Sequence, residues 1–316
     1  MTSEAVDTTL DTLIGPYPSI ARIVQAVCAV WPEHARYLLK SMSPRDDSMM
    51  RTTETLAEAA LILADSRLDE IAKHYRWTCD QLRDEELFFH REGRYRFSTF
   101  AEADAAVYSD AEYMKKYMDG LLISQITWYN HAASCDFFLS ATPEILGQGR
   151  RYLEIGPGHG LMMYLALRDF HLESAAAWDL SAVSIAQTEA ALAKLGYENC
   201  NFRVQNVTDA KDEAGQYNLL VISEVLEHLE DPKDVMVSLH KLIDPSDGHI
   251  FVNVPINSPS PDHLYLMETL DDARDLLTDT GFEIVSEGFF PTQGTSLDRA
   301  LRNRISVSAC MLGRPL

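Results

Sequence analysis

The chain has 316 residues, of which 46% are hydrophobic and 24% are charged, a composition typical of a soluble globular protein with a sizeable core. Its formal net charge of −21 disfavours nucleic acid or an anionic membrane surface as the general partner. The five cysteines form no CxxC pair, and no signal peptide or membrane span is visible, so we expect reduced thiols and a cytoplasmic location.

Residues 1–149 predict a mainly helical domain that acts as a lid or in substrate recognition. Apolar residues recur at helical spacing in four segments, at Ile20–Trp31, Thr55–Ala64, Leu68–Trp77 and Glu112–Leu139. The last of these is long enough for one bent helix or two. Aromatic residues on both sides of Glu92 and Gly93 also predict a short β-hairpin over residues 87–97.

Residues 150–316 alternate β-like and helical segments, which predicts a Rossmann-like α/β domain with helices on both faces of the sheet. Seven strands are expected, at residues 152–155, 175–178, 201–204, 218–223, 249–254, 282–288 and 305–311. Ser181, Asp231 and Thr269 can each cap the N-terminus of an intervening helix. The last two strands are close in sequence, so we expect a mostly parallel sheet with one antiparallel edge strand.

The most informative segment is an apolar run that contains Glu154 and leads into a glycine-rich turn. Three glycines follow on alternate positions, at Gly156, Gly158 and Gly160. Such a turn lets backbone NH groups at a helix N-terminus approach a ligand, although it can also be a simple chain reversal. Leu161 stands where a dinucleotide-binding fingerprint needs its third glycine, which disfavours an NAD-dependent reductase.

The pattern Glu154-x-Gly-x-Gly-x-Gly resembles the first motif of the class I S-adenosylmethionine-dependent methyltransferases. Asp179 and Leu180 follow the second strand and match the second motif, in which a carboxylate accepts the ribose hydroxyls and an apolar side chain covers the adenine. The segment 223–232 follows the fourth strand and resembles the fourth motif of the ubiquinone and menaquinone biosynthesis branch. The resemblance does not extend to residues 1–149.

This resemblance implies that S-adenosylmethionine is bound, with S-adenosylhomocysteine as the product. The cofactor-binding residues that it indicates are Glu154, Gly156, Gly158, Gly160, Asp179, Leu180, Asn206, Val207, Ser223 and Glu224. Asn206 departs from the acid that family members often carry after the third strand, but its amide oxygen can accept the same hydrogen bond. Asp179 has a structural alternative as a helix-capping residue ahead of Ser181.

Two histidines are candidate general bases, which methyl transfer needs only where the acceptor must lose a proton. His228 lies four residues after Glu224, on the turn that the family directs toward the acceptor. His263 follows the fifth strand, at the end of the sheet where ligands bind in open α/β folds. A helix-start histidine bonded to backbone is the structural alternative for His228, and His159 is expected to shape the glycine turn.

An aromatic group before the first strand is the candidate substrate-binding set, with Tyr117, Trp128, Tyr129 and His131 as its members. Such side chains can offer walls to a sulfonium or a planar acceptor, whereas aromatics at helical spacing are more often core. Arg91, Arg94 and Arg96 can recognise an anionic group, or can be solvated charges. No metal site is indicated, because the sequence has neither HExxH nor paired CxxC.

The sequence therefore predicts a methyltransferase that modifies oxygen, nitrogen or carbon of a small molecule in biosynthesis, with secondary metabolism as the expected setting. A methyltransferase acting on protein or RNA is one alternative, and a non-catalytic protein that binds S-adenosylmethionine is another. No nucleic-acid or membrane partner is expected, and a homo-oligomer is compatible with the sequence.

Overall fold

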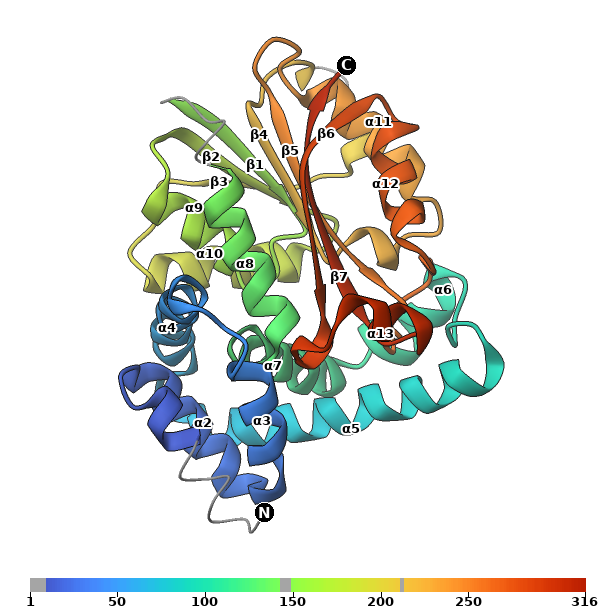
Figure 1. Ribbon diagram of the computed structural model, residues 1–316. Coiled ribbons are helices and arrows are strands. Elements are labelled where there is room, and N and C mark those ends of the chain that lie inside the picture. Colours follow the sequence, from blue (N-terminus) through green and yellow to red (C-terminus); the bar gives the residue numbers. More distant parts are fainter. Residues whose placement is uncertain (1–9, 143–148, 211–212) are drawn as a thin grey trace. The chain divides into compact units, whose positions relative to one another are not determined.

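The computed structural model describes residues 10–142, 149–210 and 213–316 (Figure 1). These residues form two compact units. The helical unit comprises Met1–Asp136, Ser258–Leu264 and Phe290–Val307, and the sheet unit comprises Phe137–Asn257, Tyr265–Phe289 and Ser308–Leu316. None of the helices in the described residues is long and apolar enough to cross a membrane.

The sheet unit contains one seven-stranded sheet in the order β3-β2-β1-β4-β5-β7-β6 (Figure 1). Its strands are β1 (Arg150–Ile155), β2 (Leu172–Asp179), β3 (Asn201–Val204), β4 (Leu219–Ser223), β5 (His249–Ile256), β6 (Phe282–Pro291) and β7 (Val307–Pro315). The first five strands pair in parallel, and β6 and β7 form one antiparallel pair at the edge. The predicted α/β fold class is confirmed.

Three of the four helices that follow β1, β2, β4 and β5 begin at the predicted caps, and the first begins after Gly160 without a side-chain cap. They are α9 (Leu161–Asp169), α10 (Ala182–Lys194), α11 (Pro232–Leu242) and α12 (Leu270–Thr278). Ser181 accepts a hydrogen bond from the Ser184 NH, and Asp231 accepts from the first turn of α11. Thr269 forms a capping box with Asp272 at the start of α12. These short-range bonds fix where α10, α11 and α12 start.

The helical unit is built mainly from α-helices joined by short 3-10 turns. Its helices are α2 (Pro18–Val30), α3 (Ala35–Met42), α4 (Asp47–Ala64), α5 (Leu68–Glu92), α6 (Phe100–Ala103), α7 (Ala111–Thr127) and α13 (Leu297–Arg302), with a π-helical turn, η3 (Asp104–Tyr108), after α6. The segment 112–139 is two helices, because Trp128 adopts an extended conformation between α7 and α8 (Tyr129–Ala141). The chain passes from the helical unit to the sheet unit within α8.

The β-hairpin predicted over residues 87–97 is wrong. Helix α5 continues through the predicted first arm and ends at Gly93, whose φ of 74° makes it a left-handed helix C-cap. Phe89 is fully buried, as are residues in the earlier turns of α5. Its burial therefore favours the helix over the strand that the aromatic residues would otherwise prefer. Arg91, Arg94 and Arg96 place their guanidinium groups over the ring of Phe88, a half-buried residue of α5, at 4.4 to 5.7 Å from the ring centroid.

Candidate functional site

The glycine turn follows β1 as predicted and has three residues in the left-handed region. The φ angles of Gly156, Gly158 and Gly160 are 65°, 53° and 72°. A Cβ atom on Gly156 would lie 2.5 Å from Val225 Cγ2, whereas a Cβ on Gly158 would meet nothing within 4 Å. Gly156 therefore allows close packing against the turn after β4, and Gly158 leaves open space at the N-terminus of α9.

Glu154 is a buried carboxyl group beside this turn. Its exposed fraction is 3%, and the Tyr152 hydroxyl donates to its Oε2 at 2.5 Å. Burial raises the pKa of Glu154 to about 8, while the hydrogen bond from Tyr152 acts in the opposite direction. The carboxyl is therefore mostly protonated at neutral pH, and a cation placed next to it would favour its ionised form.

Asp179 is the last residue of β2 and Leu180 follows it, as predicted. Asp179 Oδ1 accepts from the Ser181 NH at 2.8 Å, and Oδ2 accepts from Ser184 Oγ at 2.7 Å. These bonds show that Asp179 has the predicted helix-capping role, and they hold its carboxylate in one orientation. Two carboxylate oxygens can accept further bonds, so the capping role is compatible with binding ribose hydroxyls. Leu180 is 64% exposed, and an apolar surface of this kind can contact a planar base.

Asn206 caps the 3-10 turn η4 (Val207–Asp209) that follows β3. Its Oδ1 accepts from the NH and the hydroxyl of Thr208, at 3.0 and 2.9 Å. The amide oxygen expected to meet an adenine is thus already engaged in a local turn. Val207 is the first residue of this turn and is buried.

Glu224 occupies a constrained turn after β4. Its φ is 54°, and its NH donates to the Asn253 carbonyl at 2.9 Å. Asn253 Nδ2 donates to Glu224 Oε1 and to Ser223 Oγ, both at 3.0 Å. Burial raises the pKa of Glu224 to about 7, against the effect of the hydrogen bond from Asn253. A positive φ is uncommon for glutamate, so the two hydrogen bonds with Asn253 hold this turn in a conformation that the residue does not favour by itself.

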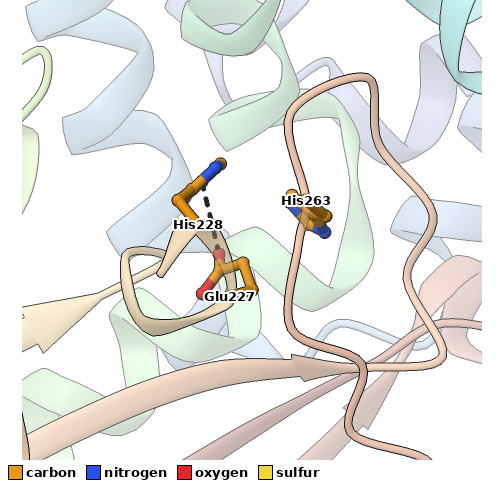
Figure 2. A group of neighbouring side chains, drawn as sticks. All are labelled: Glu227, His228 and His263. Atoms are coloured by element: carbon orange, nitrogen blue, oxygen red, sulfur yellow. Dashed lines mark ion pairs between the residues drawn. The ribbon is translucent and has the colours of Figure 1, made fainter. Parts of the chain in front are cut away.

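His228 follows on the 3-10 turn η6 (Leu226–His228), where Figure 2 shows it beside Glu227. Its Nε2 lies 3.7 Å from Oε1 of Glu227, a side chain with no exposed surface. The His228 NH donates to the Val225 carbonyl at 3.0 Å. The backbone hydrogen bond expected of a structural histidine at a helix start is therefore also present. An imidazole next to a buried carboxylate can exchange a proton or help to hold a cation.

His263 lies on the loop after β5, which Figure 2 also draws, and is part of the helical unit. Its Nδ1 is 2.7 Å from the Ser258 carbonyl oxygen, and the ring packs edge-on against Tyr95 with centroids 5.7 Å apart. The side chain is 7% exposed. Sequence reasoning missed Tyr95 because it lies far from the loop in the chain.

The predicted substrate-binding residues have separate surroundings within the helical unit. Trp128 Nε1 donates to the Tyr75 hydroxyl at 3.0 Å, and its ring lies 4.8 Å from that of His131. Burial lowers the pKa of His131 to about 4, which keeps this imidazole neutral. Tyr129 packs against a small core cluster, and Tyr117 is buried with its hydroxyl on the loop that carries His263. Only Trp128 and His131 contact each other through their rings.

One group in the helical unit has ligand atoms close enough for a metal ion, formed by Glu70, His74 and Asp119. Lys115 Nζ lies 2.5 Å from Glu70 Oε1, and Arg67 pairs with Asp119 at 3.2 Å. The two cations already compensate these carboxylates. The group is therefore best described as an ion-pair network between α5 and α7.

Comparison with known proteins identifies the class that this fold and turn define. Residues 128–304, more than half of the chain, match the methyltransferase domain family, and the chain belongs to that family. The resemblance inferred from the motifs is confirmed.

The chain is 29% identical over 117 residues to a ubiquinone biosynthesis O-methyltransferase of Bordetella avium, and 29% identical over 119 residues to one of Marinobacter nauticus. Each alignment covers 35% of this chain, and it spans 45% and 46% of the respective relatives. Among solved structures, a putative sarcosine dimethylglycine methyltransferase from Galdieria sulphuraria aligns with a TM-score of 0.49 at 15% identity, over 61% of this chain and 86% of that protein.

Proposed function

We propose that the sheet unit binds S-adenosylmethionine and that the protein transfers its methyl group to a small molecule. The observation that carries the proposal is the glycine turn, where Gly158 leaves open space at the N-terminus of α9 beside the buried carboxyl of Glu154. Backbone NH groups and a carboxyl so arranged suit the ammonium and carboxylate of an amino-acid moiety.

The remaining cofactor residues extend this site along the carboxyl ends of the parallel strands. Asp179 would bind the ribose hydroxyls, Leu180 would cover the adenine, and Asn206 and Val207 would lie at its edge. Ser223 and Glu224 would hold the methionine end, with Gly160 completing the turn. The fit is supported by the fixed orientation of Asp179 and by the exposure of Leu180.

Bound S-adenosylmethionine would supply a methyl group that is already activated as part of a sulfonium. The protein's main task is then to hold the acceptor in line with that methyl group and to exclude water. A hydroxyl or amine acceptor must also lose a proton, and His228 and His263 are the candidate bases. The helical unit is proposed as the part that recognises the acceptor.

A small-molecule acceptor is supported by the names of the relatives and by the net charge of −21, which disfavours RNA. The named relatives are O-methyltransferases, so a hydroxyl group is the first acceptor to test. A role in a biosynthetic reaction sequence is part of the same proposal.

The proposal can be tested by calorimetry with S-adenosylhomocysteine. We expect Asp179→Ala to weaken binding by about 1–3 kcal/mol, the loss typical when hydrogen bonds to a charged group disappear. Ser184→Ala is the matched control, because it removes a partner of Asp179 but keeps the carboxylate. Unchanged affinity in Asp179→Ala would remove this residue from the ribose site.

Turnover is tested with isotopically labelled S-adenosylmethionine and fractionated cell extract. Label in a small-molecule fraction, absent with Asp179→Ala, would support the proposed activity. Label only in protein or RNA would favour a macromolecular substrate. Binding without any transfer would favour a non-catalytic S-adenosylmethionine-binding protein.

A further inference from the structure

Asn253 is a buried polar residue of β5. Its exposed fraction is 3%, and it lies next to Ser223 in the parallel register of β4 and β5. A buried amide has lost its hydration, so its polar atoms need partners within the protein. The side chain finds such partners on β4, on the turn after β4 and on β7, all of which belong to the sheet unit.

The hydrogen bonds of the Asn253 amide determine which way it faces. Its Nδ2 donates to Ser223 Oγ and to Glu224 Oε1, both at 3.0 Å. On the other side, the thiol of Cys310 on β7 donates to Oδ1 at 3.4 Å. The opposite orientation would turn Oδ1 toward the carboxyl oxygen of Glu224, which cannot donate when it is ionised. The amide is therefore held with both of its NH hydrogens on residues 223 and 224.

Asn253 also holds the backbone of the turn after β4. The Glu224 NH donates to the Asn253 carbonyl oxygen at 2.9 Å, and the φ of Glu224 is 54°. The next side chain along, Val225, packs against Gly156, where a Cβ atom would lie 2.5 Å from Val225 Cγ2. Asn253 is thus linked through one turn to the carboxyl of Glu224 and to the glycine turn after β1.

The carboxyl of Glu224 has polar neighbours from three elements. Besides Asn253 on β5, Glu227 on η6 and Ser308 on β7 form side-chain hydrogen bonds with it, and the imidazole of His228 lies 3.7 Å from Glu227. Burial raises the pKa of Glu224 to about 7, and the hydrogen bonds act in the opposite direction, with that from Asn253 the strongest. The bond from Asn253 therefore helps to keep this carboxyl ionised near neutral pH.

We propose that Asn253 is a positioning residue of the cofactor site, which holds the carboxyl and the backbone of Glu224 in the arrangement that receives the ammonium group of S-adenosylmethionine. The inference rests on the proposed binding of this cofactor and deepens it. An ammonium group binds an ionised carboxylate more strongly than a neutral carboxyl, and a carboxylate fixed in advance loses less entropy on binding. Asn253 acts only through Glu224 and the turn that carries it.

The first test follows the protonation of Glu224 without any cofactor. NMR of glutamate labelled with ¹³C at the carboxyl carbon reports it, and Glu224→Gln assigns the resonance. We expect the pKa of Glu224 to rise by about 1 or more in Asn253→Ala, because an NH donor to the carboxylate is lost. Asn253→Asp keeps the volume of the side chain but replaces Nδ2 by oxygen, so it should raise this pKa as well.

Asn218→Ala is the matched control. Asn218 is also a buried asparagine of the sheet unit, with an exposed fraction of 7%, and its Nδ2 donates to Asp247 Oδ1 at 2.6 Å. It precedes β4, whereas Glu224 follows the other end of that strand. The control variant should lose stability in urea unfolding but should leave the pKa of Glu224 unchanged.

The second test measures the affinity for S-adenosylhomocysteine by calorimetry as a function of pH. Because an ammonium group favours the ionised carboxyl, the affinity should rise as the pH passes the pKa of Glu224. A rise of about 1 in this pKa should weaken binding in Asn253→Ala about fivefold at about pH 7 and displace the profile to higher pH. Asn218→Ala should stay within about twofold of the native affinity. Glu154 titrates in all of these proteins, so the comparison between them isolates Glu224.

The outcomes separate this proposal from the proposed function. A native titration of Glu224 in both Asn253 variants would overturn the positioning role. An equal loss of affinity in Asn253→Ala and Asn218→Ala would overturn it too, because destabilisation alone would then explain the effect. Absence of S-adenosylhomocysteine binding by the native protein would instead contradict the proposed function, whereas the titration would still show whether Asn253 holds Glu224.

Discussion

Replacement of Glu154 by Gln should change how the stability of the sheet unit depends on pH. Burial raises the pKa of this carboxyl from 4.5 to about 8, so the folded state binds a proton that the unfolded state releases. The contribution of Glu154 to the free energy of unfolding is highest below pH 4.5 and falls as the pH rises from there to about 8. The shift corresponds to a loss of about 5 kcal/mol across that window.

Glu154→Gln removes this titration and retains an oxygen that can accept from the Tyr152 hydroxyl. We expect the variant to gain stability relative to the native protein by most of that amount as the pH rises from about 5 to about 8. Urea unfolding, followed by pulsed hydrogen exchange of a β1 peptide, reports on the sheet unit alone.

The exposed residue Glu189 on α10 provides the control, because Glu189→Gln changes the same charge without burial. A stability difference between Glu154→Gln and the native protein that stays constant within about 1 kcal/mol over the pH range would show that the pKa of Glu154 is not raised by folding.

Three further predictions follow from packing and from the candidate bases. Gly156→Ala should destabilise the protein by about 1–3 kcal/mol and weaken S-adenosylhomocysteine binding. Residue 156 has a left-handed backbone conformation, and a Cβ atom there would clash with Val225. Native stability of the variant in urea unfolding would contradict this prediction. His263→Ala should lower kcat by about 10²–10⁴ and His228→Ala by about tenfold, with cofactor affinity preserved in calorimetry. If EDTA abolishes the activity and Mg²⁺ restores it, these histidines bind a metal ion, and their role as proton acceptors is contradicted. Phe89→Ala should cost about 3–5 kcal/mol in thermal or urea unfolding, whereas Leu87→Ala on the exposed side of α5 should cost little; equal effects would contradict the observed helix face.

Short-range patterns determined most of the sheet unit. Strand β3 has the bounds predicted, and Ser181, Asp231 and Thr269 cap the helices that they were expected to start. Periodicity, caps and glycine turns act over a few residues, so the sequence expresses them directly. The order of Glu154, the glycines and Asp179 along alternating strands also indicates the family from the sequence alone.

Long-range contacts decided what the same patterns could not. The aromatic residues after Leu87 have a β preference, but burial of Phe89 in the helical unit extends α5 through them. Strand β7 lies between β5 and β6, a placement that proximity in sequence does not specify.

The loop 258–264 shows the same division at the candidate base. The sequence indicated His263 from its place after a parallel strand, but the bonds of Asp262 to Tyr108 and Tyr117 join residues more than 140 positions apart. Only the folded chain brings these hydroxyls to one buried carboxylate, because burial and hydrogen-bond geometry depend on the packing of elements that no local pattern encodes.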